Sequence, residues 1–120
     1  MVRRSRGPRH QYDPENIVLR VLADDRLARI VEIIFSMNRL VHASDIAREL
    51  GISIGHAYNL LRKLEKWGVL KGVRDPLNGR LGFRPASTKT SELVAEELRK
   101  RRAREVEEAV VEVVERYARE

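Results

Sequence analysis

The sequence predicts a mainly α-helical protein with one small β-hairpin, of the α+β class, and a long C-terminal helix. Three observations lead to this prediction. Two amphipathic helical patterns meet at a tight turn in residues 51–53. Two β-prone segments flank residues 75–79, Asp-Pro-Leu-Asn-Gly, in which the proline fixes φ and Asn-Gly tolerates positive φ. Residues 88–120 contain neither glycine nor proline, so nothing in this segment interrupts a helix.

The length and composition limit the class of protein. A chain of 120 residues supports one modest hydrophobic core. Because it has no cysteine, disulfides, thiolate metal sites and cysteine nucleophiles are excluded. No apolar run approaches the roughly 18 to 20 residues that span a bilayer, and no apolar stretch of a secretion signal follows the basic N-terminus. We therefore expect a small cytoplasmic protein that is associated with no membrane.

The positive charge is unevenly distributed along the chain. The formal net charge is +6, from 24 lysine and arginine residues and 18 aspartate and glutamate residues. Residues 1–12 contain four arginines and no acid, and residues 53–87 contain seven basic residues against two acidic ones. The other two segments, 13–52 and 88–120, are slightly acidic. Charge concentrated in this way is typical of a protein that binds a polyanion on one face.

The first elements along the chain are a basic arm and a short helix. Residues 1–12 are expected to be flexible, serving either as a tether to DNA or as a solubilising tail. A helix then begins at Asp13-Pro14, with Asp13 able to cap it and Pro14 suited to its first position. Because the following apolar residues are largely β-branched, residues 15–22 also remain compatible with a strand, although we favour a helix.

A second helix is predicted to begin at Asp24 or Asp25, either of which can cap it. Its apolar residues recur at helical spacing on one face. They are Leu27, Ile30, Val31, Ile34 and Phe35. This pattern is the strongest helical signal in the N-terminal half of the chain.

Residues 44–67 contain two helices joined by the tight turn. Ser44 is expected to cap the first helix and Gly51 to end it in a left-handed conformation. Ser53 is expected to cap the second helix, which ends at Gly68. Its inward positions are Ala57, Leu60, Leu61, Leu64 and Trp67, and its outward positions are Gly55, His56, Asn59, Arg62, Lys63 and Lys66. A second helix that is basic on its outer face predicts a helix-turn-helix motif, in which that helix enters the major groove of DNA.

The β-prone segments, residues 69–74 and 80–84, predict a hairpin beside this motif, which would form a wing. Its basic side chains, Arg74, Arg80 and Arg84, can reach phosphates or a narrow minor groove. With the preceding helices, the hairpin completes a domain that we place at residues 13–87.

The C-terminal segment, residues 88–120, predicts a helix of about 45 Å, too long to be buried in so small a domain. Its distal half carries an apolar stripe, which consists of Val106, Val110, Val113, Val114 and Tyr117. An apolar stripe on a projecting helix needs a partner, so we predict a homodimer in which two copies pair as a coiled coil. Residues 99–104 hold five bases, which either contact phosphates or form a solvated face.

These motifs resemble the winged helix-turn-helix transcription regulators of bacteria and archaea, in the ArsR/MarR-like group. The resemblance covers about residues 15–98 and is carried by LRVLADDRLARIVEII, residues 19–34, and DIARELGISIGHAYNLLRKLEKWGVLK, residues 45–71. It implies base contacts from Gly55, His56, Tyr58 and Asn59, phosphate contacts from Arg62 and Lys63, and backbone or minor-groove contacts from Asn78, Gly79 and Arg80. The cysteine-containing metal site of metal-sensing ArsR members has no counterpart in residues 40–50, so thiolate metal sensing is not implied.

The resulting hypothesis is a homodimeric transcription regulator that binds double-stranded DNA sequence-specifically. No catalytic residue, cofactor or metal site is expected, since His10, His42 and His56 are isolated, and any small-molecule effector is unknown. The DNA-binding candidates are Gly55, His56, Tyr58, Asn59, Arg62, Lys63, Lys66, Arg74, Asn78 and Arg80. Roles without a base contact stay open for His56, Tyr58 and Asn59. Two alternative functions also stay open, a winged-helix protein-interaction module in a larger complex and a non-specific, chromatin-like DNA binder.

Overall fold

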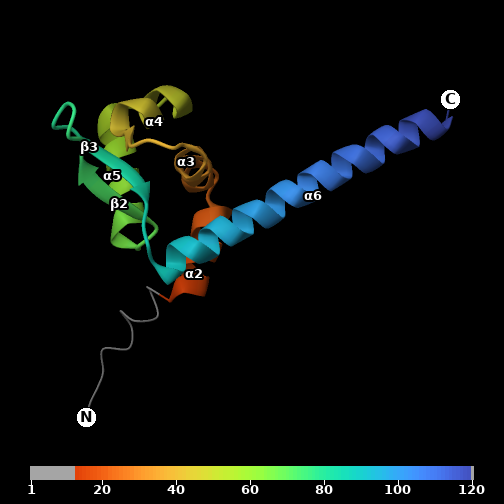
Figure 1. Ribbon diagram of the computed structural model, residues 1–120, viewed down its shortest axis with the longest axis horizontal. Coiled ribbons are helices and arrows are strands. Elements are labelled where there is room, and N and C mark those ends of the chain that lie inside the picture. The colour runs from red at the N-terminus through yellow and green to blue at the C-terminus, as the bar shows by residue number, and fades with distance from the viewer. Residues whose placement is uncertain (1–12, 120) are drawn as a thin grey trace, which may run out of the picture.

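A computed structural model of the chain describes residues 13–119, so the basic arm of residues 1–12 lies outside the described residues (Figure 1). Helices dominate, as expected for a mainly α-helical α+β fold with a small sheet. In chain order the elements are α2 (Pro14–Ala23), α3 (Asp25–Ser36), β1 (Val41–His42), α4 (Ala43–Leu50), α5 (Ile54–Lys66), β2 (Leu70–Arg74), β3 (Leu81–Pro85) and α6 (Lys89–Arg119).

The first segment is a helix and not a strand. Helix α2 begins at Pro14 and buries Ile17, Val18 and Val21. Asp13 occupies the N-cap position, but its side chain makes no capping hydrogen bond. At the next helix, α3, the prediction of an aspartate cap is confirmed. The Asp24 carboxylate accepts hydrogen bonds from the backbone N–H groups of Arg26 and Leu27, at 2.9 and 3.1 Å.

The helix-turn-helix forms as the sequence predicts, with one correction. Gly51 ends α4 at a φ of 67°, and Ser53 caps α5 by accepting a hydrogen bond from the His56 N–H at 3.1 Å. The prediction that Ser44 caps α4 is wrong, because the N-cap is His42, two residues earlier, and the helix begins at Ala43.

The start of α4 is instead fixed by Asp45. Its carboxylate reaches back to accept a hydrogen bond from the backbone N–H of His42, at 2.9 Å. An acidic residue at the third helical position satisfies an N-terminal N–H group that would otherwise lack a partner. Ser44 has a different role, because its hydroxyl accepts a hydrogen bond from Arg80 of the hairpin at 3.0 Å.

The hairpin belongs to a three-stranded antiparallel sheet with the strand order β1-β3-β2. Its two predicted strands form, and β1 is an additional strand that the sequence pattern does not indicate. Val41 pairs with Phe83, and His42 pairs with Gly82. A Cβ atom at Gly82 would lie 2.8 Å from Leu40 Cβ, so the absence of a side chain allows this close approach of β1.

The core lies between the helices and the inner face of the sheet. Phe83, Ile30, Ile34, Leu61 and Leu64 are fully buried. The proximal part of α6 docks on this body through three buried residues. These are Thr90, Ser91 and Val94.

The distal part of α6 projects away from the body (Figure 1). Every residue from Arg102 to Arg119 is exposed, and the structure measures 66 Å along its longest axis. The predicted long C-terminal helix is therefore confirmed, at 31 residues.

Candidate nucleic-acid interface

Helix α5 presents a polar face to solvent. Ala57, Leu61 and Leu64 are buried beneath it, which turns the predicted outward positions away from the core. The exposed candidates are Gly55, Tyr58, Asn59, Arg62, Lys63 and Lys66. These positions share one side of a helix with 3.6 residues per turn, so they can meet a groove together.

The aromatic residue at the end of α5 belongs to the body of the domain, as the sequence predicts. Trp67 is half-buried and packs against the core. The Arg20 guanidinium lies 6.0 Å from its ring centroid and the Lys63 ammonium 5.7 Å from it. Lys63 thus lies over the Trp67 ring near the C-terminal end of α5.

His56 differs from the other outward residues because it is half-buried and faces α3. Its Nε2 lies 3.5 Å from a guanidinium nitrogen of Arg26. Arg26 precedes His56 by 30 positions, and nothing in its own helical pattern marks it as a candidate. The structure therefore adds an exposed arginine beside the N-terminal end of α5.

The edge of α5 that faces the hairpin carries a linked set of side chains. The Arg62 guanidinium stacks 5.8 Å from the ring centroid of Tyr58 and forms an ion pair of 3.2 Å with Glu65. Glu65 also accepts a hydrogen bond from the backbone N–H of Gly72 in β2, at 3.1 Å. Glu65 therefore fixes α5 against the hairpin and holds Arg62 on the surface.

The hairpin turn is itself ordered by its side chains. Arg74 donates a hydrogen bond to the backbone oxygen of Gly79 at 3.1 Å, and the Asn78 side chain accepts one from the Arg80 N–H at 2.9 Å. Arg80 reaches Ser44 at the start of α4, as described above. The candidate residues of the hairpin thus lie on a wing that is connected directly to the helix-turn-helix.

A second connection between the wing and the helix-turn-helix runs through His42. Its Nδ1 lies 3.7 Å from an Asp45 carboxylate oxygen, and its Nε2 lies 3.4 Å from one of Asp75 at the base of the turn. Asp45 further pairs with Arg39 at 3.4 Å and with Arg48 at 3.0 Å. Sequence reasoning treated His42 as isolated, because its partners come from other elements. Within residues 13–119 no cluster of three metal-ligating side chains is found.

The hydrogen bonds of Asp45 lead to a testable pH dependence. Burial by itself raises the pKa of Asp45, but the hydrogen bond from the His42 N–H and the hydrogen bond and charge of Arg39 outweigh it, so its pKa lies below the usual 3.8. A lowered pKa in the folded state means that the carboxylate stabilises the fold above about pH 4. That contribution is lost as the pH falls through the lowered pKa.

We expect Asp45→Asn to lower the free energy of unfolding by about 1 kcal/mol at pH 7, since the amide keeps the shape of the cap but loses its charge. The difference from the unsubstituted protein should shrink as the pH falls below about 4. Urea unfolding followed by circular dichroism at pH 7 and pH 3 measures both values. A difference that is equal at the two pH values would contradict the role assigned to the charge.

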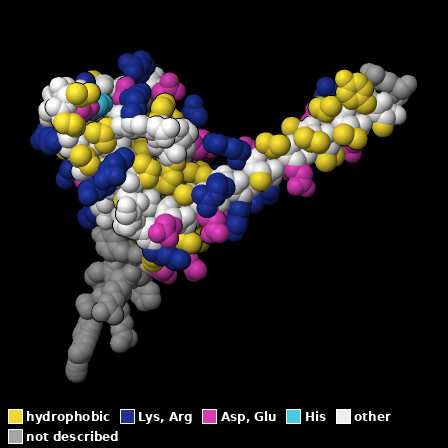
Figure 2. Space-filling view, viewed as in Figure 1, with side chains coloured by type: hydrophobic (Ala, Val, Ile, Leu, Met, Phe, Trp, Pro, Cys, Tyr) yellow, Lys and Arg dark blue, Asp and Glu magenta, His cyan; other side chains and the backbone are white. Residues whose placement is uncertain are grey.

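The exposed charges of α5 and the hairpin are predominantly basic. All seven basic residues between positions 53 and 87 are exposed, whereas the two acids of this stretch, Glu65 and Asp75, are half-buried and held by the contacts described above. Figure 2 shows basic side chains over the body of the domain, interspersed with hydrophobic and acidic ones, and a row of hydrophobic side chains along the projecting α6.

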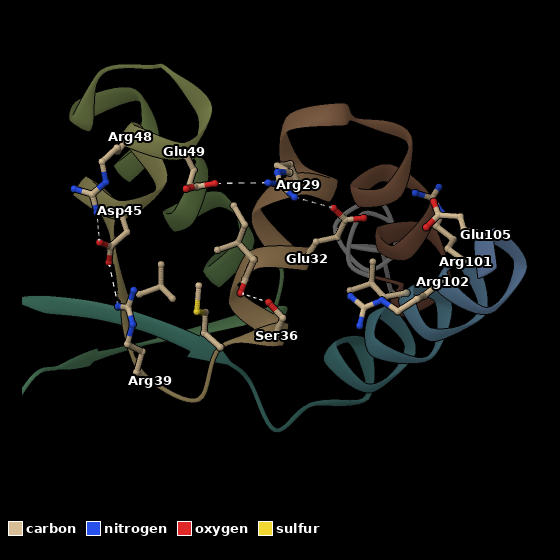
Figure 3. Close-up of a pocket in the computed structure, with 14 residues that line it drawn as sticks. Arg29, Glu32, Ser36, Arg39, Asp45, Arg48, Glu49, Arg101, Arg102 and Glu105 are labelled. Carbon is tan, nitrogen blue, oxygen red and sulfur yellow. Dashed lines mark hydrogen bonds and ion pairs between the residues drawn. The ribbon is translucent and has the colours of Figure 1, made fainter. Parts of the chain in front are cut away.

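A hollow of about 490 Å³ lies on another side of the domain, between α3, α4 and α6 (Figure 3). Its rim is a set of ion pairs, in which Arg29 contacts Glu32 at 3.7 Å and Glu49 at 3.6 Å. Asp45, with its two arginines, closes the opposite side. Because acids balance most of its arginines, this hollow does not extend the basic surface, and its ion pairs link α3 to α4.

The two helices, the ordered wing and the basic outer face define a winged helix-turn-helix protein of the DNA-binding transcription-regulator class. Comparison with family models agrees, because residues 19–74 match the IclR helix-turn-helix domain. This confirms a winged helix-turn-helix transcription regulator, although the matched model is of the IclR type and not of the ArsR/MarR-like group that the sequence resembles. No curated protein sequence matches the chain significantly. The structure contains no helix long and apolar enough to cross a membrane, among the residues it describes.

Solved structures share the fold at low sequence identity. HlyU from Vibrio cholerae is 14% identical, with a TM-score of 0.58, over 72% of this chain and 89% of HlyU. FabT of Streptococcus pneumoniae, solved in complex with DNA, is 22% identical with a TM-score of 0.56, over 71% of this chain. This chain spans only 57% of the length of FabT.

A third structure is the homodimeric winged helix-turn-helix DNA-binding domain of a possible ArsR-family transcriptional regulator from Mycobacterium bovis. It is 22% identical, with a TM-score of 0.58, over 82% of this chain and 87% of that domain. At such identities, the likeness shows the shared fold.

Proposed function

We propose that this protein is a homodimeric transcription regulator that binds double-stranded DNA sequence-specifically in the cytoplasm. The observation that carries the proposal is the coincidence of three features on one surface. These are the exposed polar face of α5, the ordered wing beside it and the excess of basic residues on both. A protein-interaction module would not require this charge.

In this proposal α5 lies in the major groove. Asn59 and Gly55 are its best-placed base-reading positions, since both are exposed and the helix backbone can approach the bases closely at a glycine. Arg62, Lys63 and Lys66 contact phosphates on either side of the groove. His56 contributes through its contact with Arg26, which brings a further positive charge to the N-terminal end of the helix.

The second part of the proposal is dimerisation through α6. Val94 faces the body of the domain, and Val110 follows it by 16 residues, which places the two side chains about 160° apart around the helix. The distal stripe therefore points away from the domain of its own chain. Its five members are exposed by 43% to 72%. A second copy of α6 is the simplest partner that covers such a stripe.

The proposed dimer carries two copies of α5. If they enter successive major grooves on one side of the duplex, the DNA site consists of two half-sites about one helical turn apart, related by a two-fold axis. The Mycobacterium bovis domain of this fold is homodimeric and FabT was solved in complex with DNA, which supports a homodimer and DNA binding but not a particular spacing of half-sites.

Selection of bound duplexes from a random pool tests the proposal. The selected duplex is then titrated against a scrambled one over a series of salt concentrations. We expect tighter binding of the selected duplex by a factor of about 10³ or more, together with a steep salt dependence. Equal affinity for the two duplexes would favour the chromatin-like alternative, and no binding to either would overturn the proposal.

A further inference from the structure

The tip of the wing carries an apolar side chain that no contact explains. Leu77 is 93% exposed, which is the largest value among the exposed large hydrophobic residues of the described chain. It follows Pro76 and precedes Asn78-Gly79, in a turn where polar residues prevail in proteins. Sequence reasoning passed over Leu77, because a turn residue gives no periodic signal.

The backbone of this turn is held in place, so the side chain projects from a rigid support. The Asp75 carboxylate accepts a hydrogen bond from the Leu77 N–H at 2.9 Å. The backbone groups of Asp75 also accept from the Gly79 N–H and donate to the Arg80 oxygen, both at 2.7 Å. Pro76 locks its own φ at the start of the turn. The turn should therefore lose little conformational entropy when its tip binds a ligand.

Two arginines of the wing are engaged in contacts within the domain. Arg74 donates to the Gly79 oxygen at 3.1 Å, and Arg80 donates to Ser44 of α4 at 3.0 Å. Each guanidinium has further N–H groups that can meet phosphates. Leu77 is the large apolar side chain that the turn between them leaves exposed.

The place of the tip relative to α5 indicates what it meets. Strand β2 starts after the C-terminal end of α5 and runs back beside it, because the Gly72 N–H donates to Glu65. The turn consequently lies toward the N-terminal end of α5, near the start of α4 (Figure 1). On a duplex whose major groove holds α5, a hairpin at this place crosses a backbone strand and reaches the adjoining minor groove.

We propose that Leu77 is an apolar wedge that enters the minor groove beside the major groove occupied by α5. Apolar side chains at such positions partly unstack a base step and bend the duplex. Pyrimidine–purine steps deform most easily, so Leu77 selects for such a step at a position that no hydrogen bond reads. This inference rests on the proposed DNA binding and adds a specificity-determining residue to it.

The test uses the full-length protein and the duplex obtained by selection, with fluorophores at the two duplex ends to report bending. Leu77→Ala is expected to lower affinity about tenfold and to reduce the bend. It should leave the slope of affinity against salt unchanged, since an apolar contact releases no counterions. Leu19→Ala is the matched control, because Leu19 is 70% exposed on α2 and lies on no predicted DNA contact.

The outcomes separate the wedge from DNA binding as such. Equal affinity and equal bending for Leu77→Ala and the unsubstituted protein would overturn the wedge, while specific binding by both would leave the proposed function intact. A Leu77→Ala protein that loses affinity without any change in bending would also overturn it, since the wedge requires deformation. Failure of the unsubstituted protein to bind any duplex would overturn both proposals.

Discussion

Replacing both Arg62 and Arg80 with alanine is expected to weaken binding to all duplexes by roughly 50-fold at about 0.1 M salt. Each phosphate contact that is lost lowers the slope of log affinity against log salt by about 0.9, so two contacts lower it by about 1.8. Both guanidinium groups are exposed, on α5 and on the wing respectively, and each retains free donors after its contact with Glu65 or Ser44. The loss should be nearly equal for selected and scrambled duplexes, because phosphates carry no sequence information.

A matched control removes the same charge elsewhere. Arg29→Ala with Arg116→Ala takes two arginines from α3 and from distal α6, where each pairs with a glutamate as Arg62 does. We expect less than a threefold effect of this control on affinity. Fluorescence anisotropy with a labelled duplex measures all three proteins. Unchanged affinity in the Arg62 and Arg80 variant would contradict the assignment of α5 and the wing to DNA.

Introducing charge into the distal stripe of α6 is expected to produce monomers. Val110→Asp with Val113→Asp places two carboxylates where the valines of two copies should meet, and burying an unpaired charge costs several kcal/mol. The domain itself should stay folded, since both valines are exposed in the single chain. Light scattering gives the mass, and circular dichroism gives the helix content.

Helix geometry supplies the control for this prediction. Val111 is 50% exposed but lies about 100° around the helix from Val110, off the stripe. Val111→Asp should therefore remain a dimer at the concentration where the double variant is monomeric. A double variant that keeps the mass of a dimer would refute the interface. The monomeric variant should also bind the selected duplex much more weakly, because two separate monomers would have to bind the two half-sites of the duplex independently.

Local chemistry accounts for the parts of the fold that were predictable from sequence. The aspartate cap at Asp24, the left-handed Gly51 and the serine cap at Ser53 depend on a few neighbouring residues, and each is found where the pattern predicts it. The choice between helix and strand for residues 15–22 was less clear, because β-branched residues suit both. In the structure this segment is a helix, which places Ile17 and Val21 together in the core.

The features that sequence reasoning missed depend on contacts between distant positions. Strand β1 has only two residues, and a side chain at Gly82 of β3 would collide with Leu40 just before it. Ser44 does not cap α4, because the Asp45 carboxylate accepts a hydrogen bond from the N-cap residue His42 and so fixes the helix start two residues earlier. The Ser44 hydroxyl instead accepts a hydrogen bond from Arg80.

At the candidate site, the spacing of the buried residues of α5 is enough to predict which residues face outward. The contacts that these outward side chains make cannot be predicted in this way. The pairs that join His56 to Arg26 and His42 to Asp75 cross from one element to another, so no spacing within an element reveals them. The roles of the ten DNA-binding candidates stay predictions until a duplex is bound.

Methylation protection of guanine N7 on the selected duplex tests most directly whether α5 lies in the major groove of DNA. N7 faces the major groove, so a bound helix shields it from the reagent. We expect two protected patches whose centres are about 10 base pairs apart, one for each subunit of the dimer. Guanines that stay fully reactive throughout a duplex that is demonstrably bound would contradict major-groove entry by α5.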